Sequence, residues 1–252
     1  MKYEMKNIKS DFYNSKKEQA FLEHLDDRDE AFWDSLSFLN ELNNIGRFDN
    51  EDVAFYQARF LITGRLINHI ASAYHLLKMG LEDECLIMYR QSLENSWLLK
   101  YFIQKPNHAR EWMDIENPKN IRPKQRRKIL ENEEAAERIY SKLSSVVHSN
   151  HKSFWGVCVG GMFNHVITDE LFGHLIATVN ESIQYFTEIM NLFHTTIEET
   201  EHAELYKEIS LKLGMCIYIT SYFKDPNRTI SMLKKNGEDD VIRYLKSNYK
   251  RV

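Results

Sequence analysis

The stretch GLEDECLIMYRQSLENSWLLKYFIQKP, residues 80–106, decides the fold class. It opens with Gly80, a residue type that commonly ends a helix, and continues with three acidic residues that suit the positive end of a new helix. Apolar residues then recur at helical spacing, namely Leu86, Ile87, Leu93 and Trp97. The pattern runs to Gln104, just before Pro106. We therefore predict a helix over 82–104 that forms an antiparallel hairpin with the helix before it, because the link is very short.

Helical spacing of apolar residues continues along most of the chain. Further long helices are predicted over residues 15–43, 51–80, 168–199 and 203–223, with Asn50 and Thr168 as caps. Shorter helices are predicted over 107–113, 227–235 and 239–250, and another ends near His148. The 252 residues include only 9 Gly and 4 Pro, so turns are few. This composition favours long helices over a many-stranded sheet, and the sequence predicts an all-α fold.

Composition narrows the class of protein. Hydrophobic residues make up 43% and charged residues 28%, as in ordinary globular domains. The net charge of −4 gives no overall attraction to nucleic acid or to an anionic membrane, so any such contact must be local. Apolar runs are far shorter than the roughly 20 residues of a membrane span. The three cysteines are far apart and favour a reducing compartment. We expect a cytoplasmic protein without membrane contact.

A polar pair interrupts the apolar stripe of residues 82–104. Arg90 lies within the stripe, and Glu94 follows one helical turn later. Burying a lone guanidinium costs several kcal/mol, so Arg90 needs a partner or a ligand. Two interpretations stay open: a buried Arg90–Glu94 pair that fixes helix packing, or a cation directed at an anionic ligand.

A second polar stripe follows on a later helix, where Tyr140, Ser144 and His148 are spaced four residues apart. A phenol, a hydroxyl and an imidazole together can donate, accept and transfer protons near neutral pH. The alternative is that His148 only stabilises a helix C-terminus. His151 lies three residues beyond His148 and is a candidate ligand-binding residue. No carboxylate follows at a helpful distance, so we expect no metal and no other cofactor.

A basic segment over 119–128 is followed at once by an acidic one over 131–137. One interpretation is a solvated helix face with pairs such as Arg127 and Glu131. The other is a phosphate-binding edge, in which Arg126 and Arg127 bind the ligand.

The segments HLLKMGLEDECLIMYRQSLENSWLLKYF and YSKLSSVVHSN resemble a bacterial family of unknown function with HEPN-like helical architecture. The resemblance covers roughly residues 55–151. The matching positions are Arg90, Ser92, Glu94, Tyr140, Ser144 and His148. It implies an up-and-down helical bundle over residues 1–203, with its core over about 50–200, and a C-terminal helical extension over 204–252. It also implies a homodimer, because HEPN relatives commonly dimerise.

Many HEPN proteins are metal-independent ribonucleases of toxin or anti-phage systems, and they carry an arginine a few residues before a histidine on one helix. This chain departs from that spacing, because Arg138 precedes His148 by ten residues and Arg65 precedes His69 by four. The first hypothesis is nevertheless RNA cleavage or RNA binding. His148 would act as general acid or base, Arg90 would stabilise phosphate charge, and Tyr140 and Ser144 would orient the substrate.

The second hypothesis is a non-catalytic helical module that binds a protein, RNA or a small ligand. In this case Arg90, Glu94, Tyr140 and His148 form a structural polar network. The sequence does not decide whether the protein is an enzyme.

Overall fold

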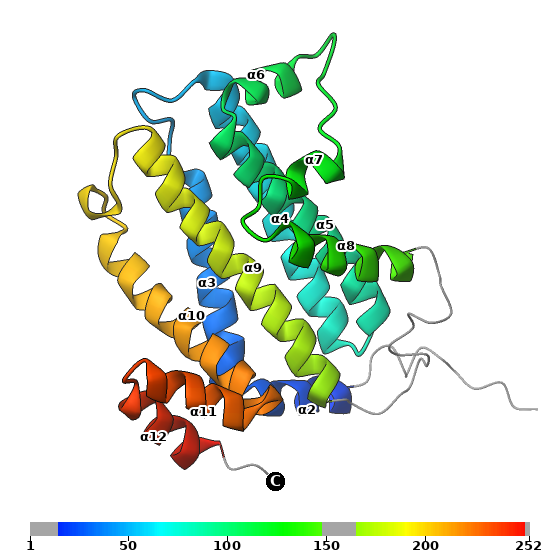
Figure 1. The fold of residues 1–252 in the computed structure, drawn as a ribbon, viewed down its shortest axis with the longest axis vertical. Coiled ribbons are helices and arrows are strands. Elements are labelled where there is room, and N and C mark those ends of the chain that lie inside the picture. The colour runs from blue at the N-terminus through cyan, green and yellow to red at the C-terminus, as the bar shows by residue number, and fades with distance from the viewer. Residues whose placement is uncertain (1–14, 148–164, 250–252) are drawn as a thin grey trace, which may run out of the picture.

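The computed structural model describes residues 15–147 and 165–249, and this part of the chain is all helical, with no strand. Figure 1 shows long helices side by side along the molecule. They are α3 (Asp27–Asn44), α4 (Val53–Lys78), α5 (Glu82–Gln104), α9 (His165–Leu192) and α10 (Ala203–Lys224). The predicted all-α class is confirmed, whereas the HEPN-like topology stays a prediction.

Shorter helices cover the ends and one face of this bundle (Figure 1). One end carries α2 (Ser15–Leu25), α11 (Pro226–Lys235) and α12 (Asp239–Asn248). Towards the other end lie α6 (Asn107–Met113) and α7 (Pro123–Arg127). Helix α8 (Glu133–Val147) packs on α5, and the short helix η1 (Ile197–Glu199) lies between α9 and α10.

The predicted hairpin of α4 and α5 is confirmed, and it forms the most extensive helix–helix contact of the described residues. Gly80 ends α4 with a φ of 71°, a conformation in which an L side chain would be strained. Its N–H donates to the Leu77 carbonyl, and the Leu81 N–H donates to the Leu76 carbonyl, both at 2.9 Å. These two bonds satisfy carbonyl groups that the end of a helix otherwise leaves open.

Apolar side chains of the described residues form a central core among the long helices, a second core of α4, α5 and α9 that includes Phe55, Phe102 and Ile189, and a small separate core at the C-terminal end. In the central core, α10 contributes Leu213 and Cys216, which are packed with residues of α3, α5 and α9. The small core joins α10 to α11 and α12 through Ile219, Leu233 and Leu245. Helix α10 therefore belongs to the central and the C-terminal core. The division of the chain at residue 203 stays a prediction.

The predicted helix over 15–43 is wrong, because the chain breaks between α2 and α3. Asp26 adopts a φ of 52° with a ψ of −134°, a backbone conformation outside the left-handed helical region that is strained for an L residue. Arg28 supports the break from the interior: its guanidinium donates to the carbonyls of His24 and Leu25 and to Asp169 of α9. The contact with Asp169 spans 141 residues, so helical spacing within the segment does not indicate it.

Other predicted boundaries also differ from the structure. Helix α4 is capped by Asp52, whose carboxylate accepts from the N–H of Ala54 at 2.9 Å, and not by Asn50. Helix α9 runs over His165–Leu192, so Thr168 is buried inside it and does not cap it. The same helix ends seven residues before the predicted position 199, since His194 takes a φ of 61° and the chain turns away.

Candidate functional site

Arg90 of α5 makes the contacts that connect the predicted site residues. Its Nε donates to Glu94 Oε1 at 3.1 Å, one turn along the same helix. Its Nη2 donates to the hydroxyl of Tyr140 on α8 at 2.8 Å. The side chain is only 13% exposed, so both contacts replace water that the guanidinium has lost. The structure thus brings Arg90, Glu94 and Tyr140 together.

Arg126 and Arg127, at the end of α7, reach the same place. Arg126 Nη1 donates to the Glu94 main-chain carbonyl at 3.2 Å and lies 3.7 Å from Glu94 Oε2. Burial lowers the pKa of Arg126, and the nearby Glu94 and Tyr140 act in the opposite direction. A partly buried cation needs a carboxylate or another polar partner nearby. Glu94 is such a partner for both Arg90 and Arg126.

Arg127 uses the aromatic face of Tyr140. Its guanidinium carbon lies 3.9 Å from the centroid of that ring, and Arg90 approaches the same ring at 4.7 Å. Arg127 Nε also donates to Glu137 Oε2 at 2.8 Å. Cation–π contacts of this kind strengthen when the groups are desolvated, and the Arg127 side chain is only 6% exposed. We call this set the arginine network: Arg90, Glu94, Arg126, Arg127, Glu137 and Tyr140.

The predicted pair of Arg127 and Glu131 on one helix is wrong, although Arg122, Lys124 and Lys128 of the basic segment are exposed. Helix α7 ends at Arg127 and α8 begins at Glu133, so no continuous helix places these residues one turn apart. Arg127 turns inward to Glu137, while Glu131 lies in the connection and lines a neighbouring cleft.

The remaining predicted residues lie at or beyond the end of α8. Ser144 is half-buried one turn after Tyr140, and no hydrogen bond within the described residues links its hydroxyl to the arginine network. His148 and His151 lie outside the described residues. Their proposed roles in proton transfer and ligand binding stay predictions.

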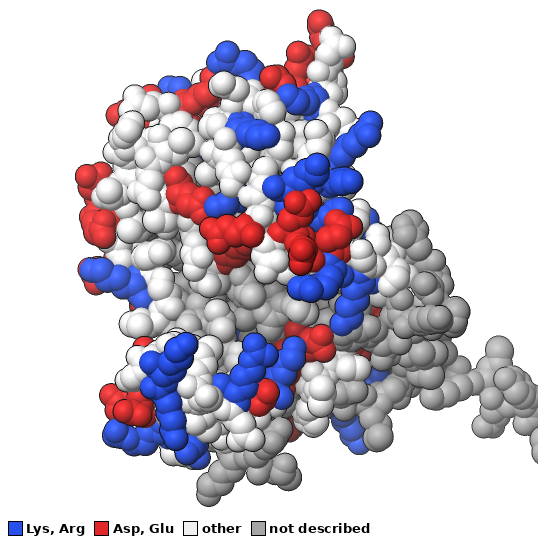
Figure 2. Space-filling model, in the orientation of Figure 1, with Lys and Arg blue, Asp and Glu red and all other residues white. Residues whose placement is uncertain are grey.

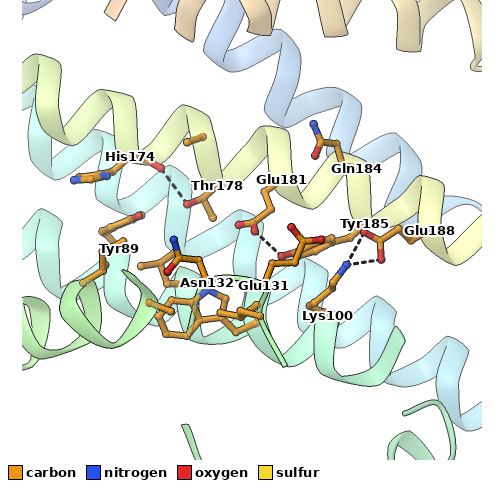
Figure 3. Close-up of a pocket in the computed structure, with 16 residues that line it drawn as sticks. Tyr89, Lys100, Glu131, Asn132, His174, Thr178, Glu181, Gln184, Tyr185 and Glu188 are labelled. Carbon is orange, nitrogen blue, oxygen red and sulfur yellow. Dashed lines mark hydrogen bonds and ion pairs between the residues drawn. The ribbon is translucent and has the colours of Figure 1, made fainter. Parts of the chain in front are cut away.

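A cleft of about 550 Å³ lies between α5, α9 and the connection that leads into α8. Figure 3 shows polar residues from all three elements around it. They include Lys100, Glu131, His174, Glu181, Tyr185 and Glu188. Trp97 of α5 also lines the cleft, and its ring centroid lies 6.4 Å from that of Tyr140. The arginine network therefore stands directly behind one wall of the cleft.

Two pairs of side chains organise the α9 side of the cleft (Figure 3). Lys100 Nζ lies 2.6 Å from both carboxylate oxygens of Glu188. The Tyr185 hydroxyl donates to Glu181 Oε1 at 2.6 Å. Burial raises the pKa of Tyr185, and the charge of Glu181 raises it further, so the phenol stays protonated as a donor.

His174 and Tyr89 form the opposite part of the cleft lining. Their rings stack with centroids 5.4 Å apart and planes 17° apart. Burial lowers the pKa of His174, so the imidazole is neutral at neutral pH. The imidazole therefore adds a polar edge to the cleft without adding a positive charge.

Helical spacing in the sequence does not reveal this cleft, although α9 carries a signal for it. His174, Thr178, Glu181, Tyr185 and Glu188 follow one another at intervals of three or four residues, which places them on one face of the helix. The apolar stripe of the same helix, which forms the core, is the stronger pattern. A polar stripe of this kind is also what any exposed helix face presents, so its meaning depends on the elements opposite.

Comparisons with models of known protein families, with curated proteins and with solved structures found no match to this chain. In residues 15–147 and 165–249, no group of three or more His, Cys, Asp or Glu side chains is placed to hold a metal ion. No helix in the same ranges has the length and apolar character needed to cross a membrane.

Proposed function

We propose that the chain is a non-catalytic helical module that binds a small molecule in the cleft between α5, α8 and α9. The observation that carries this proposal is the cleft itself. Its volume of about 550 Å³ lies within the usual range of ligand sites, and its walls combine aromatic rings with a few polar groups. Three separate elements form it, so a ligand would contact all of them.

The arginine network supports a structural role for most of the predicted site residues. Arg90 is engaged by Glu94 and Tyr140, and Arg127 by Glu137 and the Tyr140 ring. Groups committed to each other in this way are poorly placed to stabilise charge on a substrate. They hold α7 and α8 against α5 and so fix the wall of the cleft that contains Trp97.

RNA cleavage is the second candidate function, and one specific observation favours it. Three guanidinium groups, those of Arg90, Arg126 and Arg127, converge beside Tyr140 on the helix that leads towards His148. Such a concentration of cations is what stabilises a phosphoryl group during transfer. In this candidate, His148 would supply the general acid or base.

Ligand-observed NMR with a small panel of compounds tests the first proposal. The panel contains AMP, citrate, 2-phenylethanol and phenethylamine, which differ in charge. Ala177 is exposed and lines the cleft, so Ala177→Trp fills the cleft without disturbing the core. We expect at least one compound to bind the wild type and Leu211→Trp, a control at an exposed position of α10, but not Ala177→Trp.

Incubation with mixed RNA in the absence of added metal separates the two candidates. The wild-type protein is compared with Arg90→Ala, His148→Ala and the exposed control Arg243→Ala. We expect the folded wild type to leave the RNA intact. Cleavage that persists in Arg243→Ala and is lost in both Arg90→Ala and His148→Ala would establish the second candidate and overturn the first.

A further inference from the structure

We propose that the ligand of the cleft is an organic amine, whose ammonium group lies between Glu131 and Glu181 and whose apolar body lies against Leu93 and Trp97. This inference rests on the proposed function and names the chemical class of the ligand. It is argued from the charge, the aromatic surface and the shape of the cleft.

The side chains that line the cleft carry more negative than positive charge. The residues that line it include three carboxylates, Glu131, Glu181 and Glu188, but only one ammonium group, that of Lys100. Figure 2 shows acidic side chains gathered over the middle of α9 and over the connection that leads into α8. Glu181 is half-buried, whereas Glu131 is exposed, and a cation placed between the two carboxylates would be attracted by both.

Lys100 shows how this cleft holds an ammonium group. Its Nζ contacts both oxygens of Glu188 at 2.6 Å and lies 5.0 Å from the centroid of the Tyr185 ring. A carboxylate together with an aromatic face is the combination that recognises ammonium groups. The cleft therefore already contains one amine-binding arrangement, occupied by a side chain of the protein.

Glu131 and Glu181 offer a second arrangement without a resident cation. No Lys or Arg of the described residues forms an ion pair with either carboxylate. Glu181 accepts one hydrogen bond from Tyr185, which leaves acceptor positions for a ligand. Figure 3 shows Glu131 and Glu181, from opposite walls, directed into the same part of the cleft.

The rest of the cleft suits the apolar part of an amine. Leu93 and Trp97 of α5, with Leu130 and Ile139 opposite, line it with hydrocarbon and aromatic surface. Tyr89 of α5 and His174 of α9, whose rings stack on each other, line another part of the cleft. His174 is neutral at neutral pH and so does not compensate the carboxylates. The described carboxylates are not grouped to chelate a metal ion, which favours an organic cation.

Isothermal titration calorimetry with three compounds that share a phenethyl group and differ in the charge at its end tests this inference. Phenethylamine, 2-phenylethanol and 3-phenylpropanoate are cationic, neutral and anionic, respectively. We expect only phenethylamine to bind the wild type. Glu181→Gln keeps an acceptor for Tyr185 and removes only the charge, so it should weaken binding about tenfold or more without unfolding the protein. Glu131→Gln should act in the same direction, and Glu41→Gln on α3 is the matched control.

The outcomes separate failure of the inference from failure of the proposed function. Binding of 2-phenylethanol as tight as that of phenethylamine, or tighter binding of 3-phenylpropanoate, would refute the amine inference. If Ala177→Trp still blocked that binding, the ligand-binding function would stand. If neither these compounds nor the wider panel bound at all, both proposals would fail. Unchanged phenethylamine binding in both Glu131→Gln and Glu181→Gln would also refute the assigned position of the ammonium group.

Discussion

The arginine network and the cleft lie on two sides of the same pair of helices, α5 and α8, but they differ in how charge is compensated. In the network, each guanidinium has a carboxylate, a carbonyl, a hydroxyl or an aromatic face as its partner. In the cleft, Glu131 and Glu181 have no cationic partner among the described residues. Charge that the fold itself compensates contributes to structure, whereas charge left open to a cleft is available for a ligand.

Charge compensation in the arginine network is incomplete at Arg127. Its Nη1 is buried without a hydrogen-bond partner in the described part of the chain. The guanidinium lies against the ring of Tyr140, which compensates part of the charge but does not accept a conventional hydrogen bond. The charges of the arginine network are therefore largely compensated, but this one nitrogen of Arg127 lacks a hydrogen-bond acceptor within the described residues.

The largest effect is expected when the network loses Arg90. Arg90→Leu removes the hydrogen bonds to Glu94 and Tyr140 and leaves Glu94 with only the more distant Arg126. Hydrogen bonds to charged groups contribute about 1.5–3 kcal/mol each, so the loss of both should lower the free energy of unfolding by about 3–6 kcal/mol. Urea denaturation measures this loss.

The matched control is Arg243→Leu on α12. Arg243 is 79% exposed and, within the described residues, pairs with Asp240, which is 91% exposed, so its loss should cost less than about 1 kcal/mol. Equal stability of the two variants would contradict the structural role of the network. In that case Arg90 would again be a candidate catalytic residue.

The two regions also differ in how far the sequence predicts them. Arg90 and Glu94 stand out because each is a charge within an apolar stripe, and burial follows from helical spacing alone. Tyr140 stands out as part of a polar stripe on its own helix, but its contact with Arg90 spans 50 residues and does not follow from spacing. The positions of Arg126 and Arg127 depend on the connections around α7, which no periodicity describes.

The cleft could not be predicted in the same way, because its walls meet only in the folded chain. Lys100 and Glu188 are 88 residues apart, and Glu131 comes from a connection without regular structure. Likewise, the break at Asp26 depends on the contact of Arg28 with Asp169. Local spacing predicts the long helices because their stripes form the core, but it does not predict which polar faces are brought together.

A smaller effect tests the contribution of the Tyr140 hydroxyl separately from that of its ring. Tyr140→Phe keeps the aromatic face for Arg90 and Arg127 and removes only the hydrogen bond to Arg90. Because this bond comes from a charged donor, we expect a loss of about 1.5–3 kcal/mol in the free energy of unfolding. Tyr218→Phe on α10 serves as the control in the same urea experiment. A loss as large as that of Arg90→Leu would mean that the hydroxyl, and not the ring, holds the network together.

The smallest effect concerns the cleft and its pH dependence. Burial lowers the pKa of His174 in the folded protein below its ordinary value of 6.5, while Glu170 opposes this change and Lys224 and Lys142 add to it. Between the folded pKa and 6.5, the unfolded chain binds more protons at this residue than the folded chain does, so acidification destabilises the fold. His174→Gln removes this contribution. We therefore expect the melting temperature of the wild type to fall more between pH 7 and pH 5 than that of the variant, by about 1–2 °C. The His174 side chain is 36% exposed, so an equal fall in both proteins would show that its partial burial does not change its protonation on folding.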